Sequence, residues 1–597
     1  MNLKGYFKEL QRRHVVKAGI AYLVVAWLLI QVLSILFPVF KTPDWVMQLS
    51  VIVLAIGFPI WLILAWVYDF SWGSIQKTED VPFDAEVSRK KNVGLNRVII
   101  GGLAIAVILL VVNTLRLSSK VDKIEGQYLS MEFTNSLAIL PFEDLSPKKD
   151  QRYFSDGLAR SIYDRLASYK DLKLISPTSS FQYRNKDVSI EVIAGELGVR
   201  YILEGNVQLF DKRYRASINL VDTKDGTTIW SKIFDDTLED VLDTYDEVAQ
   251  NVGQYLNVTI ANADVRNRKV DPEAYLLCLR ATDTLQSNSY KKEYALVADS
   301  LIRESIRLDP TYALSHAILS MTTLHKGLYG GEYSYDQALA IGLRAARKAV
   351  ELEPEDFYGY NWLSNWQWHS KNAKASNEAL NMAWKLVPNS ADVIYYAAFQ
   401  ARRQNRLKDC LNYSERSVAL DPKNPEPYYE IVTSNYMLGD FERAEWALRQ
   451  SYEHKHEDVY FYGDLGYLYF LKGDFEKALE YSGKCEIEHS RYYNQSLMFY
   501  SKGDLIQADS TLTLLRGLPN DENYDLNTDF YLSMVYAFRG ENDLAFEHLD
   551  RSEDYIKVYL EFFFTVPEFK NLYDDPRWDS FIDNLSQEFN YDFKHKM

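Results

Sequence analysis

The sequence predicts a multi-domain membrane protein with three transmembrane helices, a small α/β domain and a long array of paired helices. Three observations lead to this prediction: charge-free apolar runs near the amino terminus, alternating strand and helix patterns over 135–258, and Pro and Gly spaced 34 residues apart beyond residue 271. The 597 residues are 47% apolar and 25% charged, so the chain can bury several cores. This composition excludes a disordered chain and a small disulfide scaffold.

The apolar runs lie in residues 18–116. Those at 18–37 and 46–68 contain no charged residue and have about the 20 residues that a helix needs to cross a bilayer. The run at 97–115 has a shorter apolar stretch, and Arg97 and Arg116 bracket it. We therefore expect three membrane-spanning helices, with the lipid bilayer as a partner of the chain.

The basic residues of this region predict its orientation. They gather in the tail at 1–17 and between the second and third runs, and basic segments flanking membrane helices favour the cytoplasm. The prediction is a bacterial inner-membrane protein whose amino terminus is cytoplasmic. The linker at 117–134 and all later domains are then expected in the periplasm.

Charge and motifs limit the possible activities. The net charge is −17, and the chain beyond residue 123 carries 52 Lys and Arg against 75 Asp and Glu, which argues against a nucleic-acid partner. The three cysteines lie far apart, and no phosphate-binding loop, nucleophile elbow or zinc-protease motif occurs. His454 and His456 could hold a metal, although a solvated turn explains them better. We expect no catalytic, cofactor-binding or metal site.

The α/β domain is expected over 135–258. Apolar runs and alternation predict strands at 136–142, 172–176 and 227–234 and a hairpin of 201–210 with 214–222. Apolar residues at helical spacing predict helices at 155–169, 190–197 and 238–256, the second closed by Gly198.

The stretch SLAILPFEDLSPKKDQRYFSDGLARSIYDRLASYKDLKLISPTSS, which begins at Ser136, resembles the TolB-like amino-terminal domain of bacterial membrane proteins. The resemblance implies relatives that join this domain to an adenylate cyclase or a winged-helix domain, followed by repeats. The short tail at 1–17 and the loop between the second and third runs leave no room for either output domain. We therefore expect a non-enzymatic protein. The alternative is a sensory or accessory subunit of a split signalling system, which acts on a separate cytoplasmic cyclase or transcription regulator through a membrane-embedded contact.

A repeat array is expected over 271–556. Pro354, Pro388 and Pro422 lie 34 residues apart, as do Gly439 and Gly473, and this is the tetratricopeptide period. We expect seven helix pairs, give or take one, with a ten-residue insertion near 330–331. The segment 557–597 is expected to cap the array.

The first helix of each repeat predicts a binding groove. On frames that start at residues 357, 391, 425 and 459, positions 2, 5, 9 and 12 share one face. Large aromatic and amide side chains at these positions suit a peptide. We therefore predict an interaction scaffold or sensor, unless these aromatics pack within the superhelix or under the cap. The candidate groove residues are Tyr358, Asn361, Asn365, Trp368, Tyr395, Phe399, Arg402, Tyr429, Tyr436, Tyr460, Tyr467 and Phe470.

Overall fold

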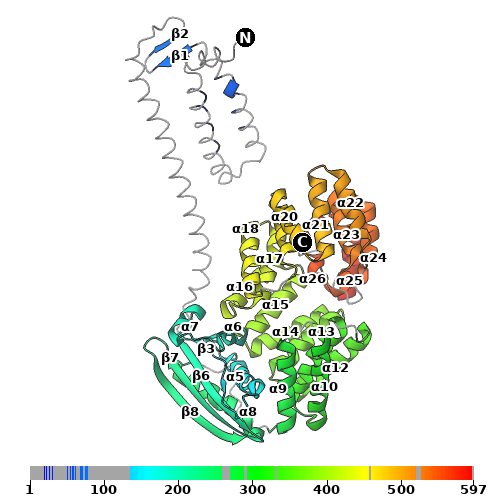
Figure 1. The fold of residues 1–597 in the computed structure, drawn as a ribbon. Helices are drawn as coiled ribbons and strands as arrows, with labels where there is room; N and C mark the ends of the chain where they lie inside the picture. Colours follow the sequence, from blue (N-terminus) through cyan, green and yellow to red (C-terminus); the bar gives the residue numbers. More distant parts are fainter. Residues whose placement is uncertain are drawn as a thin grey trace. The chain divides into compact units, whose positions relative to one another are not determined.

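The computed structural model describes residues 135–258, 269–287, 292–329, 332–455, 459–519 and 526–593, with scattered positions between 19 and 77. The chain divides into two compact units, Met1–Ser130 and Met131–Met597. In the first unit, β1 (Tyr68–Ser71) pairs with β2 (Ser74–Lys77) as a short antiparallel hairpin (Figure 1).

The membrane prediction requires correction. No helix among the described residues combines the length and the apolar character that crossing a bilayer demands. The expected spans at 18–37 and 46–68 are described only at isolated positions, and the span at 97–115 lies outside the described residues. The predicted membrane fold class is therefore wrong by this finding, and so are the bilayer partner and the inner-membrane localisation that depended on it.

The second unit begins with an α/β domain around a mixed sheet of order β5-β3-β6-β7-β8. Strand β3 runs parallel to its neighbours β5 and β6, whereas β6, β7 and β8 are antiparallel neighbours, and the short β4 also pairs with β6. The bounds are β3 Ser136–Ile139, β4 Glu143–Asp144, β5 Lys173–Ile175, β6 Tyr201–Phe210, β7 Arg213–Asp222 and β8 Thr227–Thr237. The strands predicted from the sequence are confirmed.

Helices cover both faces of this sheet (Figure 1). Successive strand residues point to opposite faces, so Leu137 packs in the core under α5 and α8 while Ala138 packs in the core under α7. Gly198 ends α7 with a left-handed φ of 62°, as expected from the sequence. The helices are α5 Arg152–Leu166, α6 Pro177–Ser180, η2 Phe181–Tyr183, α7 Ile190–Leu197, η3 Leu238–Asp240 and α8 Val241–Tyr255.

Beyond the α/β domain, the described residues contain sixteen helices, α9 to α24, which pair in sequence order as eight antiparallel helix pairs. The array is of the tetratricopeptide type, because α13, α15 and α17 start 34 residues apart. The expected insertion at 330–331 lies outside the described residues, and the π-helix His325–Tyr329 precedes it. The bounds are α9 Pro272–Ser287, α10 Lys292–Leu308, α11 Ala313–Leu324, α12 Tyr335–Leu352, α13 Phe357–His369, α14 Ala373–Leu386, α15 Ala391–Arg403, α16 Leu407–Leu420, α17 Pro425–Leu438, α18 Phe441–His454, α19 Phe461–Leu471, α20 Phe475–Lys484, α21 Glu488–Ser501, α22 Leu505–Arg516, α23 Thr528–Arg539 and α24 Asn542–Arg551.

The turn between the two helices of a pair requires a left-handed residue. Lys371, Asn405, Gly439 and Gly473 have φ values of 61°, 55°, 76° and 76° and lie 34 residues apart. A glycine adopts this conformation without steric cost, and an asparagine tolerates it. The glycine spacing seen in the sequence therefore marks a backbone position that two earlier repeats fill with Lys and Asn.

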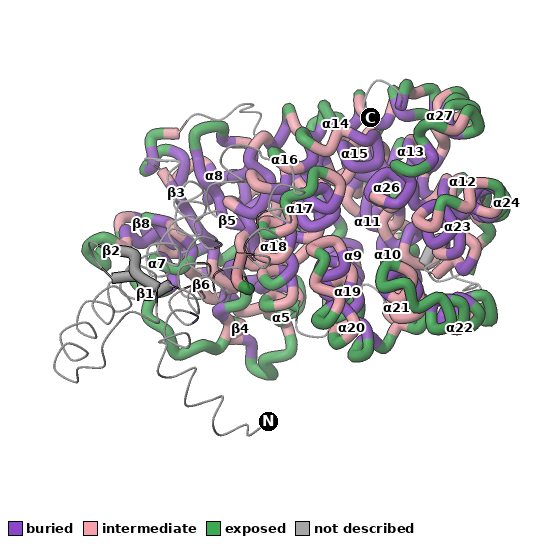
Figure 2. The backbone as a smooth tube through the Cα atoms, turned by 90° about the horizontal axis from the view of Figure 1, so that it is seen from above, coloured by how far each residue is buried: buried purple, intermediate pink, exposed green. Residues whose placement is uncertain are grey.

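The chain ends in a segment of short helices, residues 553–593, which we call the C-terminal segment. It contains α25 Glu553–Val558, α26 Leu560–Phe563, η5 Pro567–Leu572 and α27 Pro576–Phe589. Phe563, Phe569 and Phe589 of this segment are at most 2% exposed and share one core with the repeats, from Trp368 of α13 onward. Figure 2 shows this burial as a purple interior along the array.

Candidate functional site

The predicted groove residues lie on the first helices of four consecutive pairs, or directly before the helix for Tyr460, and we call this face the first-helix surface. Six of the twelve are buried, namely Asn361, Asn365, Trp368, Arg402, Tyr436 and Phe470. Tyr358, Tyr395, Phe399, Tyr429 and Tyr467 are half-buried, and Tyr460 is 38% exposed. The structure thus brings the predicted residues onto one surface but covers much of it with other parts of the same chain.

The C-terminal segment covers one side of this surface. The rings of Trp368 and Phe589 lie 5.1 Å apart, and the guanidinium of Arg402 lies 5.5 Å from the ring of Phe562. The Tyr467 hydroxyl donates to the Glu568 carboxylate at 2.7 Å. The burial of Trp368 and Tyr467 therefore follows from the fold of the chain itself.

Two buried ion pairs lie where the C-terminal segment meets α15. Arg402 Nε lies 2.7 Å from Glu430 Oε2, and Arg403 Nε lies 3.2 Å from Glu561 Oε2. All four side chains are at most 6% exposed. Burial raises the pKa of Glu430 to about 7, although the charge of Arg402 opposes this shift. These arginines are already neutralised and do not offer free charges to a ligand.

The α/β domain covers the opposite side of the first-helix surface. The Tyr358 hydroxyl donates to Asp164 of α5 at 3.1 Å, and the Asn389 side-chain amide donates to the backbone carbonyls of Tyr169, Lys170 and Leu172. Phe357 and Val393 belong to the same core as β3 and α5. The α/β domain is therefore docked on the array by packing as well as by polar contacts.

Carboxylates gather at this domain contact. Burial raises the pKa of Asp164 and of Asp392, and the charge of Arg160 opposes both shifts. Burial also raises the pKa of Asp421 to about 7, while a hydrogen bond from Ser179 opposes it. The Ser179 hydroxyl donates to Asp421 Oδ1 at 2.6 Å. Protonation of these groups therefore favours the docked arrangement.

Between the two covered sides lies a set of residues that we call the central strip: Asn361, Asn365, Tyr395, Phe399 and Tyr429. The side-chain oxygens of Asn361 and Asn365 are buried, and neither has a hydrogen-bond partner among the described residues. The rings of Tyr395 and Phe399 stack at 6.3 Å, and the Arg402 guanidinium lies 5.5 Å from Phe399 and 5.9 Å from Tyr429. The strip thus combines half-buried aromatic rings with unsatisfied hydrogen-bond acceptors.

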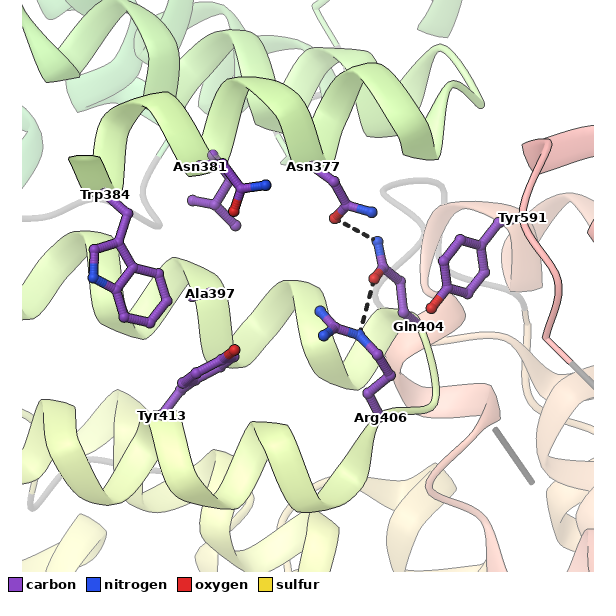
Figure 3. A pocket seen from close by; sticks show the side chains of 9 residues that line it. Asn377, Asn381, Trp384, Ala397, Gln404, Arg406, Tyr413 and Tyr591 are labelled. Carbon is purple, nitrogen blue, oxygen red and sulfur yellow. Dashed lines mark hydrogen bonds between the residues drawn. The ribbon is translucent and has the colours of Figure 1, made fainter. Parts of the chain in front are cut away.

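A pocket of about 330 Å³ lies between α14, α15 and α16, away from the predicted groove residues (Figure 3). The pocket could not be recognised from the sequence, because most of its residues come from the second helices α14 and α16 and from the turn after α15, outside the predicted groove positions. Gln404 and Arg406 of that turn follow no repeat period, and only the folded chain brings Tyr591 beside them. The lining residues are Asn377, Leu380, Asn381, Trp384, Ala397, Gln404, Arg406, Tyr413 and Tyr591.

The structure adds no support for a reactive cysteine or for a metal site at the histidine pair. Cys278, Cys410 and Cys485 are buried and free, and burial raises the pKa of the first two thiols to about 12. No group of three His, Cys, Asp or Glu within the described ranges could hold a metal ion. His456 lies outside those ranges. The absence of catalytic, cofactor and metal sites stays a prediction.

No family model matches the chain. A putative adenylate cyclase 3 of Rhizobium meliloti (strain 1021) is 31% identical over 234 residues, which cover 38% of this chain and 39% of that protein. The chain thus spans about two fifths of the length of this curated relative. The TolB-like resemblance of the α/β domain is therefore still a prediction.

Solved structures of other proteins match part of the chain at low TM-scores. The human IFIT1 dimer with PPP-AAAA has a TM-score of 0.33 at 17% identity and covers 52% of this chain and 78% of its own. PilF of Pseudomonas aeruginosa has a TM-score of 0.31 at 15% identity, over 39% of this chain and 97% of its own. At these scores the assignment of the repeat fold rests on the helix pairs and the 34-residue period of the chain itself.

Proposed function

We propose that the chain is a non-enzymatic protein-interaction scaffold and that the central strip binds a peptide segment of a partner. The segment enters between α5 and the C-terminal segment, where Tyr395, Phe399 and Tyr429 are half-buried. Tyr395, Phe399 and Tyr429 provide the contact area, and Asn361 and Asn365 fix the register. The α/β domain and the C-terminal segment form the two walls of the site.

The observation that carries this proposal is the pair of unpartnered amide oxygens. Both Asn361 and Asn365 are more than nine-tenths buried, and leaving a buried acceptor unsatisfied costs roughly 1–3 kcal/mol. A ligand that donates N–H groups removes this cost, and a polypeptide backbone donates one at nearly every residue. The two residues lie one helical turn apart on the same face of α13.

The surrounding charges favour a neutral or basic segment. Asp164 and Asp392 lie on the α5 side of the strip, and Arg402 is already paired with Glu430. The charge of Arg402 is thus not free for an acidic segment, whereas a basic segment would stabilise the ionised forms of the two aspartates. Aromatic contact and backbone hydrogen bonds then provide the affinity, and charge provides selectivity.

The test selects peptides from a random phage-displayed library on the purified full-length chain and measures their affinity for variants. Asn361→Leu and Asn365→Leu keep side-chain volume but remove the acceptor, and each is expected to weaken binding about 3- to 10-fold, the worth of one hydrogen bond. Asn584→Leu, at an exposed position of α27, is the matched control and should leave affinity unchanged.

The thermal stability of each variant separates lost binding from lost folding. Removing an unsatisfied acceptor should leave the melting temperature equal or higher, because no hydrogen bond is lost. Peptides that bind all variants with equal affinity, or a library that yields no binder, would overturn the proposal.

A second candidate is an accessory subunit of a split signalling system that acts on a separate cyclase. The observation that favours it is the 31% identity with the putative adenylate cyclase of Rhizobium meliloti. Cyclic AMP formation by that relative, measured with and without the purified chain, tests this candidate. A changed rate of cyclic AMP formation would support this candidate. An unchanged rate at a saturating concentration of the chain would exclude it.

A further inference from the structure

We propose that the pocket between α14, α15 and α16 is a second binding site and that its ligand is a neutral saccharide. Its walls come from the second helices α14 and α16, from Ala397 of α15, from the turn after α15 and from the C-terminal segment, and none of the central-strip residues lines it. Its volume of about 330 Å³ falls at the lower end of the usual range for small-molecule sites. The inference is independent of the proposed peptide binding.

Aromatic rings form two sides of the pocket. Trp384 of α14 and Tyr413 of α16 are half-buried and meet edge to face, with ring centres 5.1 Å apart. Tyr591 of the C-terminal segment stands on the far side (Figure 3). Flat ring faces of this kind pack against the C–H faces of a sugar ring, which are the apolar part of an otherwise polar ligand.

A fixed set of polar groups lines the rest of the pocket. Gln404 is 1% exposed, and its amide donates to Asn377 Oδ1 at 2.9 Å while its own oxygen accepts from Arg406 Nε at 3.1 Å. These bonds hold the three side chains before any ligand arrives. The amide nitrogen of Asn377 and the amide of Asn381 are left to face the open space (Figure 3).

The charge of the pocket points to a neutral ligand. Arg406 is the one charged residue in the lining, and its Nη1 lies 2.9 Å from Asp409 Oδ2. The guanidinium is therefore neutralised by its neighbour, and an anionic ligand would have to compete with that carboxylate.

The hydrogen-bonding character of the lining favours hydroxyl groups over other ligands. A carboxamide both donates and accepts, as does a hydroxyl, so the amides of Asn377 and Asn381 match vicinal hydroxyls of a sugar. Seven of the nine lining residues carry a polar atom, and Leu380 and Ala397 do not. An apolar side chain of a protein partner would leave these polar atoms unpaired, which is costly in a desolvated site.

The experiment is saturation-transfer-difference NMR on the full-length chain with glucose, maltose and cellobiose as probes. Glucuronate tests the claim of neutrality, and N-acetylphenylalanine amide tests for a peptide side chain. We expect saturation transfer to at least one of the neutral sugars and weaker or no transfer to the other two probes.

Two surface variants of α14 make the result specific to the pocket. Asn381→Arg places a long side chain in the pocket mouth and should weaken saccharide binding about tenfold or more. Glu378→Arg adds the same side chain at an exposed position of the same helix outside the lining and should leave binding unchanged. Both residues are exposed, so folding is expected to survive, and the melting temperature checks this.

Three results would overturn the inference. The first is no saturation transfer to any neutral sugar from a chain that is folded by its melting curve. The second is transfer that Asn381→Arg leaves intact. The third is preferential binding of glucuronate or of the phenylalanine amide.

Discussion

Removing the Glu561 carboxylate should release the C-terminal segment from α15. In Glu561→Ala, the guanidinium of Arg403 loses its partner at 3.2 Å while it stays 4% exposed. At 3.2 Å two unit charges attract by about 5 kcal/mol at an effective dielectric constant of about 20. The stacking of Arg403 on Phe399 at 4.1 Å is present with and without Glu561, so it does not offset this loss. The expected loss is therefore about 3–5 kcal/mol, the usual cost of breaking a buried pair.

Hydrogen exchange read by mass spectrometry measures this loss locally. Amides of α25 and α26 should exchange about two to three orders of magnitude faster in Glu561→Ala, since each tenfold change corresponds to about 1.4 kcal/mol. Glu553→Ala is the matched control in the same segment, because its pair with Lys557 is half exposed and contributes less than about 1 kcal/mol.

The double variant Arg403→Met, Glu561→Leu identifies the cause. Replacing both charges with apolar side chains of similar length leaves no unpaired charge, so it should cost much less than Glu561→Ala. If amides of α25 and α26 exchange in Glu561→Ala at the rate of the unmodified chain, the ion pair does not hold the segment. If the double variant is as unstable as Glu561→Ala, the unpaired charge of Arg403 is not the cause.

Three further predictions follow from buried contacts. Gly342→Ala should destabilise the array, because a Cβ there would lie 2.0 Å from the ring of Trp366, and its melting temperature should fall below that of Ala340→Ser, a control at an exposed position of the same helix. The docking of the α/β domain should weaken as pH rises through about 7: the pKa of Asp421 is raised above its usual value, so its stabilising protonated form is present at lower pH and lost at higher pH. The loss falls between the ordinary pKa of 3.8 and about 7, so melting temperatures that do not fall between pH 5 and 7, or that fall equally in Asp421→Asn, would contradict this. Cys410 should not react with a thiol reagent in the folded chain, since it is fully buried and its pKa is raised to about 12, and rapid labelling before unfolding would be the opposing result.

Local sequence patterns predicted most of the secondary structure beyond residue 135. Strand alternation and helical spacing are properties of short windows, so α7 and its cap at Gly198 could be recognised directly. The turn position of the repeats was visible at Gly439 and Gly473 but not at Lys371 and Asn405, which adopt the same left-handed φ without being glycine. The apolar runs before residue 117 predicted membrane spans, but no helix among the described residues is long and apolar enough to cross a bilayer.

The cover over the first-helix surface could not be predicted in the same way. Arg403 and Glu561 lie 158 residues apart, and Tyr358 and Asp164 lie 194 apart. No periodicity relates residues at such distances, because only the folded chain brings them together. Helical periodicity predicted which residues share a face. It could not distinguish binding of a partner by these residues from their packing under the C-terminal cap.

Hydroxyl-radical footprinting of the full-length chain, read residue by residue with mass spectrometry, tests most directly whether the chain covers its own first-helix surface. If the surface is covered, Tyr460, which is 38% exposed, should be oxidised rapidly. Trp368 and Tyr436, which are 0% and 6% exposed, should be strongly protected. Oxidation of Trp368 and Tyr436 at a rate similar to that of Tyr460 would show that the first-helix surface is open and that the chain does not cover it.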